Sequence, residues 1–77
     1  MSLSRKQSFI LRYLIDNGES PGLEMVKASD GLLKRGTVYV TLGRMVDKGW
    51  LNWDVARRRR VVYSVTERGK SIMLEGE

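Results

Sequence analysis

The chain has 77 residues and a net charge of +5, and its 42% hydrophobic and 30% charged residues are typical of one small globular domain. It contains no cysteine and no histidine, which excludes disulfide bonds, zinc fingers, thiol catalysis and histidine-dependent catalytic triads. A chain this short needs most of its residues for a single core. We therefore expect a binding module over residues 1–77 that uses no cofactor and is not an enzyme.

The first expected helix begins at Ser4, which forms a capping-box pattern with Gln7, and ends at Asn17 ahead of a glycine. Its apolar side chains cover a wider arc than a helix with one buried side needs. This width indicates burial on two sides, with another subunit as one candidate partner. The apolar residues concerned are Phe9, Ile10, Leu11, Tyr13, Leu14 and Ile15.

Two further helices are expected in the first two thirds of the chain. The second helix starts with Ser20 as its N-cap and Pro21 in its first turn, and it ends at residues 29–31. The third helix spans residues 35–48 and is closed by Gly49. The spacing of its apolar residues is that of a helix packed on one side. These residues are Val38, Leu42, Met45 and Val46.

The start of the third helix lacks the residues that usually stabilise a helix end. Lys34 and Arg35 stand where the helix macrodipole favours acidic side chains, and there is no Ser or Asp cap. A nucleic-acid phosphate bound to the free backbone N–H groups would offset the loss of helix stability. The alternative interpretation is a poorly capped start that a surface helix tolerates. Gly43 also has two interpretations: close approach of DNA or a neighbouring helix, or a tolerated helix defect.

After the third helix the sequence pattern changes from helical spacing to alternation. Two strands are expected at Leu51–Val55 and Val61–Val65, joined by a basic connection at 57–60. Trp50 and Trp53 fit core or interface anchors better than base-stacking platforms. The strand positions expected to face inward are Leu51, Trp53, Val55, Tyr63 and Val65.

The positive charge is concentrated in one third of the chain. Residues 34–60 hold eight basic and two acidic residues, a net +6, whereas the rest of the chain carries a net −1. Such clustering is typical of proteins that bind the phosphate backbone of nucleic acids. The four adjacent arginines at 57–60 repel one another, and an anionic partner would turn this repulsion into attraction. A merely solvated surface is the alternative.

The order of elements predicts an α+β winged helix-turn-helix: three helices, a two-stranded β wing, and a short C-terminal helix over 67–74 capped by Thr66. In this fold the third helix enters the major groove of DNA. Its arginine can bind guanine, its threonines can bond to bases or phosphate, and its valine can contact the thymine methyl group. The wing arginines would lie along a minor groove or on flanking phosphates. The residues expected to contact DNA are Lys34, Arg35, Thr37, Tyr39, Val40, Thr41, Arg44, Arg57, Arg58, Arg59 and Arg60.

Two stretches of the sequence carry a family resemblance. The first is Gly-Thr-Val-Tyr-Val-Thr-Leu-Gly-Arg-Met at 36–45, followed by Asp-Lys-Gly-Trp-Leu at 47–51, and the second is Arg-Arg-Val-Val-Tyr-Ser-Val-Thr-Glu-Arg-Gly-Lys at 59–70. Both resemble the PadR-like winged-helix transcriptional regulators. The resemblance implies a DNA-binding regulator, usually a homodimer and often a repressor, with the helix that carries Tyr39 in the major groove. Val40 departs from the pattern, because many members have proline there.

The resemblance also bears on the expected partners. Family members commonly continue into a C-terminal helical region for dimerisation, and only a short segment follows Thr66 here. This leaves the first helix, with Ile72, Met73 and Leu74, as the expected dimer contact. We expect double-stranded DNA and a second copy of the chain as partners in the cytoplasm. No membrane partner is expected, because the longest apolar run is far shorter than the roughly 20 residues that span a bilayer. The alternative function is a winged-helix protein–protein interaction module without DNA binding.

Overall fold

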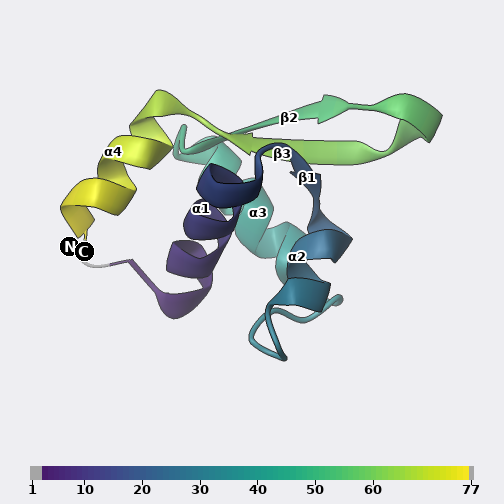
Figure 1. The fold of residues 1–77 in the computed structure, drawn as a ribbon, viewed down its shortest axis with the longest axis horizontal. Helices are drawn as coiled ribbons and strands as arrows, with labels where there is room; N and C mark the ends of the chain where they lie inside the picture. The colour runs from purple at the N-terminus through teal and green to yellow at the C-terminus, as the bar shows by residue number, and fades with distance from the viewer. Residues whose placement is uncertain (1–2, 77) are drawn as a thin grey trace.

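Helices pack against one face of a small antiparallel sheet in the computed structural model, which describes residues 3–76 (Figure 1). The three strands are arranged in the order β1-β3-β2, and β2 and β3 form the long hairpin, or wing. This arrangement confirms the winged helix-turn-helix fold. The elements are α1 Arg5–Asn17, β1 Ser20–Pro21, α2 Gly22–Ala28, α3 Val38–Asp47, β2 Leu51–Val55, a 3₁₀ turn η1 Arg57–Arg59, β3 Val61–Val65 and α4 Glu67–Gly76.

Helix α1 begins and ends as the sequence predicts. The Gln7 backbone N–H donates to Ser4 Oγ, and the Ser4 backbone N–H donates to Gln7 Oε1, both at 3.1 Å, which is a complete capping box. At the other end, Gly18 has a φ of +77° and its N–H donates to the Leu14 carbonyl. The innermost side chains of α1 are fully buried, while Ile15 is 40% exposed. Only part of the broad apolar face is therefore covered within one chain.

The second helix starts one residue later than predicted, at Gly22 rather than Pro21. Ser20 is not its N-cap, because Ser20 and Pro21 form β1 and pair with β3 opposite Tyr63 and Val62. Proline lacks a backbone N–H and is tolerated on an edge strand such as this one. The sheet therefore has three strands rather than the two expected, because β1 pairs with a partner some 40 residues away that a local pattern does not reveal.

Helix α3 also starts later than predicted, at Val38 rather than residue 35. Residues 35–37 form a turn in which the Lys34 carbonyl accepts from the N–H groups of Thr37 and Val38, at 3.2 and 2.9 Å. Thr37 occupies the N-cap position without a side-chain hydrogen bond. The predicted core face is otherwise confirmed: three of its four residues are fully buried, and Val46 is half-buried against the core.

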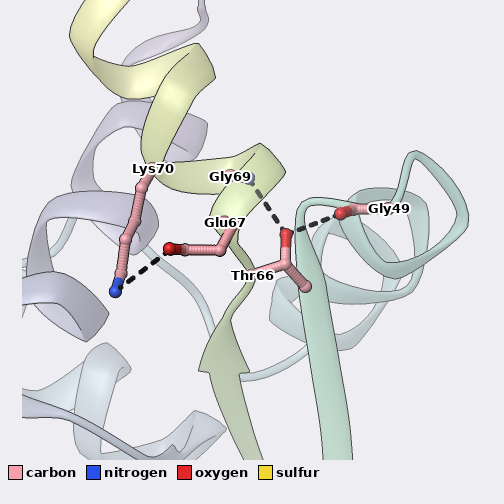
Figure 2. A network of polar contacts seen from close by, with 5 residues as sticks. All are labelled: Gly49, Thr66, Glu67, Gly69 and Lys70. Atoms are coloured by element: carbon pink, nitrogen blue, oxygen red, sulfur yellow. Dashed lines mark hydrogen bonds and ion pairs between the residues drawn. The ribbon is translucent and has the colours of Figure 1, made fainter.

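A small polar network joins α4 to the turn between α3 and β2 (Figure 2). Thr66 Oγ1 accepts from the Gly69 N–H at 3.0 Å and donates to the Gly49 carbonyl at 2.7 Å. The predicted Thr66 cap is thus confirmed, and it has a second partner. A Cβ on Gly69 would collide with the Trp50 carbonyl oxygen and the Val65 side chain. This close approach fixes the base of the wing to the helical body.

The outer half of the wing is much more exposed than predicted. Leu51 is buried, but Trp53 is 58% exposed and Val55 is 54% exposed. Both residues lie on the same face of the hairpin as Leu51, as the alternation predicts, but the prediction that they reach the core, with Trp53 as a core anchor, is wrong. The reason is visible in Figure 1: β2 and β3 extend past the helices, so no element covers this part of the hairpin. In β3, Tyr63 and Val65 pack against the core, and Val62 is also buried.

Candidate nucleic-acid interface

Helix α3 and the turn before it present a row of polar and basic side chains to solvent. A helix turns by about 100° per residue, so Val40 and Arg44 point away from the buried stripe that contains Val38, Leu42 and Met45. Val40 is 55% exposed. Of the residues in α3 and the turn before it that were predicted to contact DNA, Thr41 is half-buried and the others are exposed: Lys34, Arg35, Thr37, Tyr39, Val40 and Arg44.

The backbone at the start of α3 offers fewer free donors than predicted. The N–H groups of Thr37, Val38 and Val40 already donate to carbonyls in the turn before the helix or in its first residues. A phosphate at this helix end would therefore be bound mainly by side chains. Lys34 and Arg35 are the two exposed cations placed to do so.

The tip of the wing holds four exposed arginines in a tight turn. The Ala56 N–H donates to the Arg60 carbonyl at 2.7 Å, which closes the turn. Arg58 and Arg59 have φ values of +61° and +58°, in the left-handed region that costs a residue other than glycine about 1–2 kcal/mol. Within residues 3–76, no acidic side chain forms an ion pair with any of the four. The tip thus combines strained backbone with concentrated, unpaired positive charge.

A groove lies between the C-terminal half of α3 and the wing. Gly43 and Asp47, which lie toward the outward side of α3, line it together with Val46. Trp53 on β2 lines the opposite wall, and two further wall residues, Val61 and Tyr63, come from β3. The groove-facing side of the hairpin therefore borders the outward side of α3, and the arginine tip continues that surface beyond the Val55–Val61 pair.

Two tyrosines lie where α2, α3 and β3 meet. The ring of Tyr39 covers Gly22, where a Cβ would come within 3.0 Å of Tyr39 Cε1, and it remains 49% exposed. Burial raises the pKa of the Tyr63 phenol, and the neighbouring Tyr39 raises it further. The Tyr63 phenol therefore stays neutral through the physiological range.

Two residues behave differently from the sequence-based interpretation, and one is narrowed by the structure. Trp53 is a groove wall and not a core residue, and alternation alone does not distinguish it from an ordinary strand position. Gly43 has no atom within 4 Å of the position a Cβ would take, so close approach of a neighbouring helix of this chain is not the reason for the glycine. Lys48, counted among the clustered cations, lies over the Trp50 ring with its Nζ 5.2 Å from the centroid. This cation–π contact ties it to the base of the wing.

Other kinds of site are not found in residues 3–76. No group of three or more potential metal-ligating side chains comes together in this part of the chain. Over the same residues, no helix is both long enough and apolar enough to cross a membrane.

Comparison with known proteins identifies one family of transcriptional regulators. The model of the transcriptional regulator PadR-like family matches residues 10–75. No curated protein matches the chain. Among solved structures, a transcriptional regulator from Clostridium thermocellum is 27% identical with a TM-score of 0.79, over 90% of this chain and 75% of that one.

Two further structures show the same fold at lower identity. The YusO protein of Bacillus subtilis has a TM-score of 0.86 and is 20% identical, over 96% of this chain and 52% of its own. The transcriptional regulator PA4135 has a TM-score of 0.82 and is 24% identical, over 96% of this chain and 54% of its own. The chain thus spans about half the length of these two proteins.

Proposed function

The chain belongs to the PadR-like family of transcriptional regulators, and on this basis we propose that it binds double-stranded DNA as a cytoplasmic, homodimeric repressor. Regulation of transcription, and not catalysis, is the activity of this family. In the proposal, residues 1–77 act as one winged-helix DNA-binding domain. The observation that supports it most is that the outward side of α3 and the wing border one groove, with four exposed arginines at the outer end of the same hairpin.

Charge supplies most of the proposed affinity. Each phosphate that a lysine or arginine neutralises releases condensed counterions, so affinity gained in this way falls as salt rises. Lys34 and Arg35 would hold phosphates at one end of α3, and Arg58 and Arg59 would do so at the wing tip. Binding of an anionic partner would turn the mutual repulsion of the tip arginines into attraction.

Sequence readout is assigned to the exposed side of α3. Arg44 can bind guanine through two hydrogen bonds, and Val40 can contact a thymine methyl group. Thr41 is half-buried at the edge of this side, where its hydroxyl can reach a base or a phosphate. Tyr39 and Thr37 complete the set as donors to the DNA backbone. A groove-reading helix of this kind fixes register through phosphates and specificity through base edges.

The proposed dimer uses the opposite side of the molecule. Leu74 on α4 is 83% exposed, Ile15 on α1 is 40% exposed, and both line a hollow with Met73. Isolated exposed apolar residues are common, but neighbouring ones on two helices favour a contact with another chain. A two-fold dimer would place two α3 helices in successive major grooves, about 34 Å apart. Occupying such a site would block transcription, which is the proposed repression.

The test of DNA binding is fluorescence anisotropy with a labelled 20-base-pair duplex at several salt concentrations. The native chain should show log affinity falling linearly with log salt, with a slope of about 0.9 per phosphate contacted. An Arg58→Ala/Arg59→Ala variant should lower that slope by up to about 2. An Arg5→Ala/Lys6→Ala variant removes the same charge from exposed positions on α1 and serves as the matched control.

Two results would contradict the proposal. One is the absence of salt-dependent binding to any duplex, including pools of random sequence. The other is an equal loss of slope in the two double variants, because net charge alone would then explain the binding.

For the dimer, sedimentation velocity at micromolar concentration should give a species of twice the mass, and Leu74→Glu should return it to a monomer.

A further inference from the structure

The groove between α3 and the wing has a large exposed aromatic side chain for one wall. Its volume is about 390 Å³, many times the roughly 10–15 Å³ that a cavity needs to hold one water molecule, so it can admit a group as large as a sugar ring. The indole of Trp53 is 58% exposed there, and Val55 and Val61 beside it are 54% and 39% exposed. These three large apolar residues lie at neighbouring positions on one face of β2 and β3, and such an exposed group indicates a surface that another molecule covers.

One of the residues that line the groove is Gly43, a glycine that this chain does not need for its own fold. Gly43 lies in the middle of α3 without a positive φ, and a Cβ there would meet nothing within 4 Å. Neither backbone conformation nor internal packing therefore requires glycine, although glycine disfavours a helix relative to alanine. Gly69 makes the contrast clear, because a Cβ at that position would collide with backbone. What Gly43 provides is room at the surface.

The charges around the groove favour a polyanion as its occupant. Arg44 follows Gly43 on the outward side of α3, and the four arginines of the tip follow the outer end of the hairpin. In the proposed function α3 lies in a major groove and the tip binds DNA beside it, and the adjacent minor groove is one of the two positions expected for the tip. Adjacent major and minor grooves are separated by one sugar–phosphate strand. That strand has to pass between α3 and the wing.

We infer that this groove seats one strand of the DNA backbone, with a deoxyribose packed against the indole of Trp53 over Gly43. The inference rests on the proposed DNA binding and adds a second contact type to it. Trp53 supplies an apolar wall that any deoxyribose can contact, so it raises affinity without reading sequence. Gly43 allows the strand to approach the helix backbone, which a side chain would prevent.

One acidic residue in the groove determines where the phosphates lie. Asp47 lines the α3 wall, and its carboxylate repels a phosphate placed beside it. The uncharged sugar should therefore occupy the stretch between Trp53 and Gly43, with the phosphates displaced toward Arg44 and the tip. Asp47→Asn removes the repulsion without changing shape, and it should tighten duplex binding about threefold.

Tryptophan fluorescence tests the contact directly, since the chain has only two tryptophans. In a Trp50→Phe variant Trp53 is the sole reporter, and its quenching by neutral acrylamide should fall at least about twofold when a 20-base-pair duplex is bound. A Trp53→Phe variant reports from half-buried Trp50 at the base of the wing, and its quenching should stay unchanged.

The affinity of groove variants for duplex DNA provides a second test. Gly43→Leu fills open space, so the variant should fold at least as well as the native chain and yet bind duplex about tenfold more weakly. Asn52→Leu adds the same side chain to the opposite face of β2, where binding should change less than twofold. Thermal unfolding of both variants confirms that the affinities compare folded proteins.

Three outcomes would overturn the inference. If duplex binds with its full salt slope while Trp53 remains quenchable and Gly43→Leu binds normally, the groove is not a strand seat, and the proposed DNA binding still stands. If Trp53 becomes protected with rising protein concentration and no DNA, the groove is a contact between copies. If no variant and no native protein binds duplex, the proposed function fails and the inference fails with it.

Discussion

The base and the tip of the wing differ in how their residues affect stability. At the base the residues stabilise the fold: Thr66 makes two hydrogen bonds, Gly69 permits close packing, and Leu51 is buried. At the tip, adjacent arginines repel one another and two of them adopt left-handed backbone. The base of the hairpin is therefore built for stability, whereas its tip carries backbone strain and repelling charges.

This difference indicates where selection has acted on something other than folding. Natural sequences break local rules mainly at functional sites, and they compensate elsewhere. Here the strain at the tip is compensated within the same hairpin, because the attachment of β2 and β3 to α4 stabilises the base of the wing. The four predictions that follow test each side of this contrast.

Gly69→Ala should produce the largest loss of stability. Its Cβ would collide with the Trp50 carbonyl, and backbone cannot move aside as easily as a side chain. We expect the free energy of unfolding to fall by about 2–3 kcal/mol in urea denaturation. Gly43→Ala is the matched control, because it adds the same atom to open space in a helix and should raise stability by about 0.5–1 kcal/mol. Equal effects of the two changes would refute the packing argument.

Thr66→Ala should cost about 1–2 kcal/mol, because it removes the cap of α4 and leaves the Gly49 carbonyl without its hydroxyl donor. The matched control is Thr37→Ala at the N-cap of α3, where the side chain makes no hydrogen bond. That change should cost less than about 0.5 kcal/mol. Thermal unfolding followed by circular dichroism measures both, and a larger loss from Thr37→Ala would contradict the assignment of the cap.

Arg58→Gly and Arg59→Gly should stabilise the fold while they weaken DNA binding. Glycine relieves the left-handed strain, for a net gain of roughly 0.5–1 kcal/mol per residue after its greater unfolded-state entropy is included. Arg60→Gly is the control, since Arg60 has an ordinary φ of −79° and should lose stability. Denaturation and anisotropy on the same samples separate the two effects. A loss of stability in all three variants would remove the strain argument.

The smallest effect concerns alkaline pH. Because burial raises the pKa of Tyr63 above its ordinary value of 10.0, the folded state retains this proton where the unfolded state loses it. Its contribution to stability is therefore complete below pH 10 and is lost as the pH rises through the folded-state pKa. Urea denaturation between pH 8 and 11 should show a steeper decline for the native chain than for Tyr63→Phe. Parallel declines would mean that the phenol is not perturbed.

The sequence predicted the parts of the fold that depend on short-range patterns. The Ser4 capping box, the Thr66 cap and the buried stripe of α3 are each contained within one helix and its flanking residues. The pairing of Ser20 and Pro21 with β3 was missed because its partner is distant in the chain. Lys34 was expected to precede a free helix end, but the turn after it uses the N–H groups that were expected to be free.

The candidate site was predicted in composition more than in geometry. Alternation in β2 suggested that Trp53 faces a core, and it does face the side that packs against α3. What alternation does not specify is how far the hairpin extends past the helices, and this length leaves Trp53 exposed. The left-handed backbone of Arg58 and Arg59 was likewise unpredictable from four identical residues.

The central claim is that the outward side of α3 and the wing tip act on one DNA duplex at the same time. A ¹⁵N HSQC titration of the chain with a short duplex tests it residue by residue. The account predicts that the amides of residues 34–44 and 57–60, together with the Trp53 indole N–H, shift in parallel at the same molar ratio. Shifts confined to one of these two segments, or to α1 and α4, would contradict it.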